Sequence, residues 1–109
     1  MANYNLTSIN TPSYVSTPLK LAVAVRALRH AFDMSQTELG DLANCSRPTI
    51  NRIESIDKAS PRTDTIERLM QVFRDRGVEV QITDSEVMIR FSTKAINTAT
   101  QTSTDISEK

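Results

Sequence analysis

Apolar residues recur along much of the chain at the three- and four-residue spacing that places side chains on one face of an α-helix. One such stripe runs from Leu21 to Phe32 and another from Ile66 to Phe73. Each predicts an amphipathic helix with one buried side, and Gly77 is expected to end the second. The stripe residues are Leu21, Val25, Leu28 and Phe32 in the first helix and Ile66, Leu69, Met70 and Phe73 in the second.

Two shorter helical patterns lie between these stripes, and a serine suited to capping precedes each one. Ser35 has Glu38 three places further on, which is the spacing of a capping box. Ser46 is the second cap, and Pro48 is tolerated because the first turn of a helix has no internal partner for its missing N–H. The residues expected inside are Leu39, Leu42 and Ala43 in the first short helix and Ile50 and Ile53 in the second.

After Gly77 the apolar spacing changes from helical to alternating. Two runs alternate apolar and polar residues around the turn-forming residues 83–86. This pattern predicts a β-hairpin whose apolar face carries Val78, Val80, Ile82, Val87, Ile89 and Phe91. Because an isolated hairpin is marginal in water, this face is expected to cover the helices, meet a second copy, or both.

The two ends of the chain lack such patterns. Residues 1–17 are rich in Asn, Ser and Thr and are interpreted as a flexible segment, and residues 93–109 as a disordered polar tail. The alternative is an uncharged arm that docks on a partner. The expected organisation is therefore a helical domain at 18–76 followed by a hairpin at 77–92.

Composition narrows the range of functions. With 109 residues, the chain is long enough for about one domain, and five aromatic residues without Trp predict an aliphatic core. Thirteen basic and thirteen acidic residues cancel, which argues against indiscriminate binding of polyanions. Residues 20–76 hold ten of the basic and eight of the acidic residues, so this domain is mildly basic.

Several classes of function are not expected. Cys45 is the only cysteine, which excludes an intramolecular disulfide and favours a reducing compartment. No signal peptide or membrane-spanning run is apparent, so a soluble, cytoplasmic protein without membrane partners is expected. With two glycines and no set of catalytic or metal-ligating residues at suitable spacing, neither an enzyme nor a cofactor or metal site is expected.

The two short helices together form a predicted helix-turn-helix. The major groove of B-DNA admits one α-helix, and in this motif the second helix enters it while the first braces it. With Ile50 and Ile53 facing inward, the outward positions are Arg47, Pro48, Thr49 and Arg52, flanked by Asn51. Arg can bind guanine N7 and O6, and Thr or Pro can contact a thymine methyl. The alternative for the arginines is a solvated helix surface.

The sequence resembles the Cro/CI-type (XRE) helix-turn-helix regulators, which include lambdoid phage repressors and many antitoxins. The resemblance is carried, over roughly Leu19–Arg76, by Ser35-Gln36, Leu39, Ser46, Ile50, Ile53, Glu54 and Pro61-Arg62. It implies a mainly α fold: a lambda-repressor-like bundle of four to five helices, here followed by a C-terminal β-hairpin. Asn44 and Gly40 depart from the family's usual turn glycine and helix alanine, and Ser55-Ile56 replaces a glycine.

The resemblance also implies roles for individual residues. Gln36 is expected to contact the DNA backbone and the edge of the site, Ser46 to lie near a phosphate, and Arg62 to approach the backbone or minor groove. Arg29 and Glu54 match positions that form an internal salt bridge. The residues expected to face bases are Arg47, Pro48, Thr49 and Arg52, with Asn51 beside them.

Our hypothesis from the sequence is a transcriptional regulator, most simply a repressor that binds a palindromic operator on double-stranded DNA as a homodimer. The hairpin from Val78 to Phe91 is the expected dimerisation element. The alternative is an antitoxin, which would bind a toxin protein and autoregulate its own operon. A toxin or an antirepressor protein is thus a further candidate partner.

Overall fold

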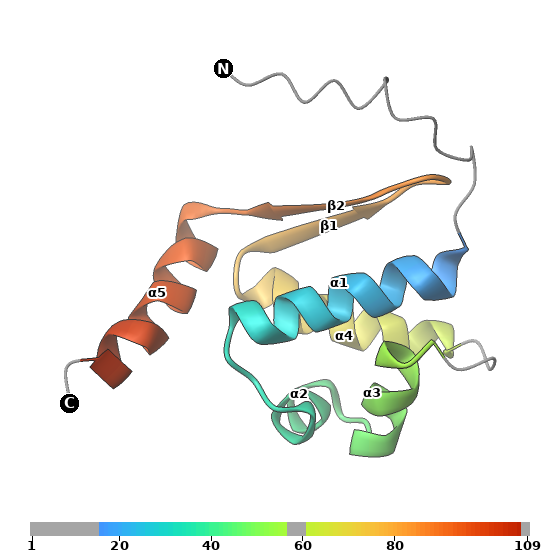
Figure 1. The fold of residues 1–109 in the computed structure, drawn as a ribbon, viewed down its shortest axis with the longest axis horizontal. Helices are drawn as coiled ribbons and strands as arrows, with labels where there is room; N and C mark the ends of the chain where they lie inside the picture. Colours follow the sequence, from blue (N-terminus) through green and yellow to red (C-terminus); the bar gives the residue numbers. More distant parts are fainter. Residues whose placement is uncertain (1–15, 57–60, 108–109) are drawn as a thin grey trace.

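The computed structural model describes residues 16–56 and 61–107. The described chain forms five helices and a two-stranded antiparallel sheet, in the order that Figure 1 shows. The elements are α1 (Thr17–Ala31), α2 (Gln36–Ala43), α3 (Arg47–Glu54), α4 (Thr63–Asp75), β1 (Val78–Ile82), β2 (Val87–Phe91) and α5 (Thr93–Ser107). The helical bundle with a C-terminal hairpin that the sequence predicts is confirmed. The segment predicted to be flexible, 1–17, lies outside the described residues except for its last two.

The core lies between α1 and α4, with α2 and α3 closing it from one side and the hairpin from the other (Figure 1). Its largest fully buried side chains come from α1, α2, α3 and α4. They are Phe73, Leu28, Leu39, Ile50, Leu69 and Val25. Phe32 stacks on Phe73 with ring centroids 6.2 Å apart. Each such buried side chain stabilises the fold by about 1.5–3 kcal/mol, so the predicted stripes supply the main folding force.

The hairpin packs its apolar face against helices of its own chain. Val78 pairs with Phe91, Val80 with Ile89, and Ile82 with Val87. Val78 is buried, and Val80 and Ile89 pack against the core. Ile82 and Phe91 stay 38% and 39% exposed, although the Phe91 ring lies 6.2 Å from that of Phe32. Intramolecular packing thus covers much of the face on which the sequence analysis placed dimerisation.

Polar contacts fix both ends of the hairpin. Lys20, which is buried on α1, donates to the carbonyl oxygens of Thr83 and Asp84 in the hairpin turn. At the other end, Gly77 has a φ of +90°, and a Cβ there would lie 2.4 Å from Ser92 Oγ. Gly77 therefore ends α4 as predicted and also leaves space for the start of α5.

Helix α5 corrects the prediction of a disordered tail at 93–109, which is wrong for residues 93–107. Ser92 Oγ accepts a hydrogen bond from the Ala95 N–H at 3.2 Å and so caps the helix. Ala95 is fully buried against the core. Thr and Ser favour helices weakly, but this cap and this buried contact outweigh that preference locally. Figure 1 shows α5 leaving the end of β2 on the opposite side of the view from α3.

Leu42 is the second correction, because it is 51% exposed and not on the inner side of α2. Leu39, Gly40 and Ala43 form that inner side. A Cβ on Gly40 would lie 2.6 Å from the Cys45 carbonyl oxygen, so only glycine permits this close approach of the helix to the following turn. With Gly40 facing inward, Leu42 is rotated out to the flank of the helix.

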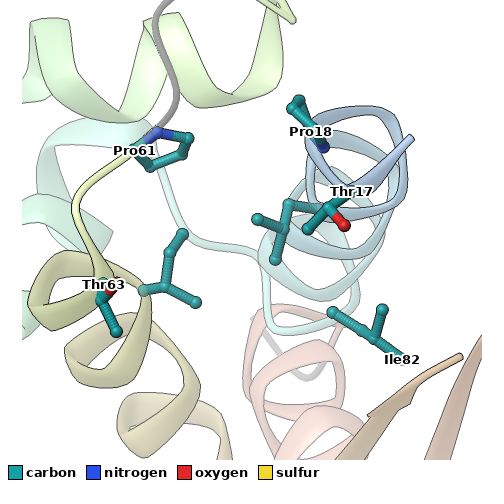
Figure 2. Close-up of a pocket in the computed structure, with 7 residues that line it drawn as sticks. Thr17, Pro18, Pro61, Thr63 and Ile82 are labelled. Atoms are coloured by element: carbon teal, nitrogen blue, oxygen red, sulfur yellow. The ribbon is translucent and has the colours of Figure 1, made fainter.

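A small cavity of about 250 Å³ lies where the starts of α1 and α4 meet the end of β1 (Figure 2). Pro18, Pro61 and Ile82 contribute to its mostly apolar walls, and Thr17 and Thr63 also line it. None of the residues lining it is ionisable. Its volume falls below the usual range of about 300–1,000 Å³ for small-molecule sites, so we assign it no ligand.

Candidate DNA-binding surface

Helices α2 and α3 form a helix-turn-helix whose two starts are capped as the sequence predicts. Ser35 Oγ accepts from the Glu38 N–H at 3.0 Å, and Glu38 Oε1 accepts from the Ser35 N–H at 2.7 Å. Ser46 Oγ accepts from the Thr49 N–H at 3.2 Å and also lies 2.8 Å from Thr49 Oγ1. These local bonds fix where each helix begins and therefore which residues face outward.

The turn between the helices depends on Asn44, which has the left-handed conformation with φ of 56° and ψ of 49°. Asn adopts this conformation more readily than most residues, which explains how it takes the place of a turn glycine. The Cys45 N–H then donates to the Gly40 carbonyl at 2.9 Å and closes the turn. Burial raises the pKa of the Cys45 thiol, with the nearby Arg68 charge acting in the opposite direction.

The outward side of α3 presents the residues predicted to face DNA. Ile50 and Ile53 are buried beneath it. The exposed residues on this side are Ser46, Arg47, Pro48, Asn51 and Arg52, and Thr49 is half-buried. Neither Arg47 nor Arg52 forms a side-chain hydrogen bond or ion pair with any other described residue. Their guanidinium groups therefore keep their donors available, which distinguishes them from the other arginines described below.

The ion pair that the resemblance implied between Arg29 and Glu54 is present in the structure. Arg29 Nε lies 2.7 Å from Glu54 Oε2, and Arg29 Nη2 donates to Glu54 Oε1 at 3.0 Å. Arg29 Nη1 also donates to the Met34 carbonyl at 2.9 Å. Both ion-pair residues are largely buried, with 13% and 5% of their side chains exposed. The hydrogen bond to Glu54 raises the pKa of Arg29 above its ordinary value, although burial of the guanidinium group acts in the opposite direction.

Gln36 joins this ion pair to the surface of α3. Its Nε2 donates to Glu54 Oε1 at 3.2 Å and, more weakly, to Asn51 Oδ1 at 3.4 Å. The sequence analysis predicted that Gln36 and Asn51 contact DNA, but it did not predict that the two side chains contact each other. One carboxylate, on α3, thus accepts hydrogen bonds from α1 and from α2.

Arg62 and Arg68 both form ion pairs with Asp64 in the first turn of α4. Arg62, which is 84% exposed, lies 3.3 Å from Asp64 Oδ1. Arg68 pairs with Asp64 Oδ2 at 3.3 Å, and its Nε donates to the Ala43 carbonyl at 2.8 Å. Although desolvation raises the pKa of the Asp64 carboxyl, these arginines and the Thr65 N–H lower it by more.

Arg68 was not among the residues that the sequence analysis singled out. It ties α4 to the end of α2 and so holds the helix-turn-helix in place. The four-residue spacing between Asp64 and Arg68 is the one signal in the sequence that indicates this pair.

The described residues contain no group of three or more His, Cys, Asp or Glu side chains placed to hold a metal ion. No helix among them is long and apolar enough to cross a membrane.

Residues 20–81, more than half of the chain, match a family of known proteins described as helix-turn-helix domain. The match covers most of α1 and all of α2, α3 and α4, and it runs into β1. A comparison with curated proteins found no match.

Proposed function

The chain belongs to the helix-turn-helix domain family, and we propose that it is a sequence-specific transcriptional regulator of the Cro/CI type. The observation that carries this proposal is the outward face of α3, where Arg47 and Arg52 are exposed and keep all their donors unpaired within the described chain. Other arginines of the domain, such as Arg29 and Arg68, are engaged in ion pairs. A face with free guanidinium groups on a braced, capped helix suits insertion into the major groove.

In this proposal, Arg47 and Arg52 read guanine, whose N7 and O6 can accept two hydrogen bonds from one guanidinium group. Pro48 and the methyl group of Thr49 contact thymine methyl groups. Ser46, at the N-terminus of α3, lies next to a backbone phosphate, which the partial positive charge of the helix end attracts. Arg62 contacts the backbone or minor groove from the start of α4.

The regulator is proposed to act as a homodimer on a palindromic operator. Two copies would place their α3 helices in successive major grooves about 34 Å apart. The described sheet has two strands, so the outer edge of each strand lacks a strand partner and is open to a second hairpin. Ile82 and Phe91 remain partly exposed beside these edges. A sedimentation equilibrium experiment that shows only monomer at tens of micromolar protein would contradict the dimer.

Repression would follow from occupancy, because a dimer bound over a promoter excludes RNA polymerase without an effector domain. The decisive experiment is selection of bound duplexes from a random DNA pool at fixed salt, since affinity for DNA depends steeply on salt. Wild type is compared with Arg47→Ala/Arg52→Ala. The matched control is Arg26→Ala/Arg74→Ala, which removes the same charge from exposed arginines outside the helix-turn-helix and the hairpin.

We expect wild type and the control to enrich one palindromic consensus and the Arg47→Ala/Arg52→Ala variant to enrich none. A control that loses the consensus equally would show that net charge, and not base reading, governs binding. Absence of any consensus with wild-type protein would refute the proposed function.

Helix α5 favours a second candidate, an antitoxin. The side chains described on this helix, residues 93–101, carry one charge, on Lys94, and Ile96 is 53% exposed. Its contacts with the core come from Ala95 and Ala99, so most of its described surface is open to a partner protein. Co-expression with the product of a neighbouring gene tests this: a stoichiometric complex lost on Ile96→Asp would support an antitoxin, and separate elution would argue against it.

A further inference from the structure

The direction of the Gln36 side-chain amide follows from the chemistry of its neighbour. A carboxylate can only accept hydrogen bonds, so the Gln36 atom that faces Glu54 must be Nε2 and not Oε1. Nε2 lies 3.2 Å from Glu54 Oε1 and 3.4 Å from Asn51 Oδ1. The Glu54 carboxylate is itself held by two bonds from Arg29. The amide of Gln36 is therefore oriented by a fixed acceptor.

This orientation leaves one acceptor and one donor for an external ligand. Neither Gln36 Oε1 nor Asn51 Nδ2 has a hydrogen-bond partner among the described residues. Asn51 is exposed, and the half-buried Gln36 has no buried side-chain atom without a partner, so Gln36 Oε1 reaches the surface as well. The two side chains touch, which places the outward acceptor next to the outward donor.

An outward oxygen does not suit the backbone contact that the family resemblance implied for Gln36. Phosphate oxygens carry no proton to donate, and two acceptors facing each other repel. An acceptor beside a donor instead complements a base edge that offers a donor beside an acceptor. Adenine is the base whose own major-groove edge has this pair, the N6 amino group and N7.

We propose that Gln36 and Asn51 together read one adenine in each half-site, an inference that rests on the proposed DNA-binding function. Gln36 Oε1 accepts from adenine N6, and Asn51 Nδ2 donates to N7. A donor and an acceptor also adjoin across a G·C pair, between cytosine N4 and guanine O6. Adenine is the simpler match because one base then supplies both groups, and the base pair selected at this position distinguishes the two.

Glu54 is a positioning residue in this arrangement, because it sets the direction of the Gln36 amide without reaching the base. Glu54→Gln would give Gln36 a neighbour that can donate as well as accept, and the Gln36 amide could then turn over. Folded Glu54→Gln protein should therefore lose its adenine preference at this position while it keeps the guanine preferences of Arg47 and Arg52. A purely structural role would weaken all positions together.

The test pairs single-atom changes in DNA with single side-chain changes in the protein. The operator recovered by selection is remade with 7-deazaadenine, which lacks the N7 acceptor, or with purine, which lacks the 6-amino group. Binding is measured for wild type, Gln36→Ala and Asn51→Ala, and both variants are checked for folding by circular dichroism. Arg52→Ala is the control that should keep its sensitivity to both base changes.

For wild type, we expect each modified base to weaken binding by about fivefold or more. Loss of N7 should have no effect on Asn51→Ala, and loss of the 6-amino group none on Gln36→Ala. Equal sensitivity in wild type and variants, or a G·C pair selected at this position, would overturn the adenine reading while the palindromic consensus upheld DNA recognition. No consensus at all would refute the proposed function itself.

Discussion

Replacing Arg29 with Met should destabilise the protein strongly, because it leaves a buried carboxylate without its cation. The substitution preserves most of the side-chain length and removes only the guanidinium group. Glu54 would lose hydrogen bonds of 2.7 and 3.0 Å and would keep the single bond of 3.2 Å from Gln36. With 5% of its side chain exposed, Glu54 has little water to replace the lost donors.

Breaking a buried ion pair by removal of one partner costs about 3–5 kcal/mol, whereas an exposed pair contributes about 0–1 kcal/mol. Because the Gln36 bond remains and Arg29 is 13% exposed, we expect the lower end, about 3 kcal/mol. For a domain of this size, that loss lowers the melting temperature by about 12 °C or more. It is a large fraction of a typical stability of about 5–15 kcal/mol.

The free energy of unfolding is measured in urea at pH 7. Arg90→Met is the control, because it breaks the exposed pair of Arg90 with Glu79 at 2.5 Å and should cost less than about 1 kcal/mol. A loss for Arg29→Met no larger than that of the control would refute the reasoning.

Three further predictions concern the turn between α2 and α3. Gly40→Ala should lower stability by about 1–3 kcal/mol in thermal melts, because its Cβ would lie 2.6 Å from the Cys45 carbonyl oxygen; unchanged stability would mean that the turn yields. Asn44→Ala should cost about 1–2 kcal/mol through its left-handed φ of 56°, and Asn44→Gly should not, whereas equal losses would point to a side-chain role. The Cys45 thiol should react with a disulfide reagent more slowly than in urea-unfolded protein, with a pH midpoint above that of a free thiol; rapid reaction at pH 7 would contradict its burial.

The parts of the fold that the sequence predicts are those governed by short-range interactions. Caps act over three residues, so Ser35 with Glu38 and Ser46 with Thr49 are visible in the sequence and present in the structure. Apolar periodicity identifies the buried sides of α1, α3 and α4, because the spacing that creates each side involves residues of one helix only. The alternation after Gly77 likewise predicts the hairpin and its apolar face.

The parts that the sequence does not predict depend on contacts between distant segments. Residues 93–107 have weak intrinsic helical preference, and α5 depends on the packing of Ala95 against the core as well as on the Ser92 cap. Leu42 fits a helical stripe by spacing, but the close approach that Gly40 permits turns it outward. The meeting of Gln36 with Asn51 depends on the angle between α2 and α3, which the spacing of residues in the chain does not specify.

Glu54 links the scaffold to the recognition surface, and the two proposed roles of its carboxylate can be separated. Arg29 donates to this carboxylate from α1, and that bond mainly supports stability. Gln36 donates to it from α2, and that bond orients the Gln36 amide. Gln36→Ala should therefore alter base preference with little change in unfolding free energy. Arg29→Met should lower that free energy, yet protein that remains folded should keep its base preference, since the carboxylate still accepts from Gln36. If both substitutions altered stability and preference in proportion, Glu54 would act on DNA binding only through the integrity of the fold.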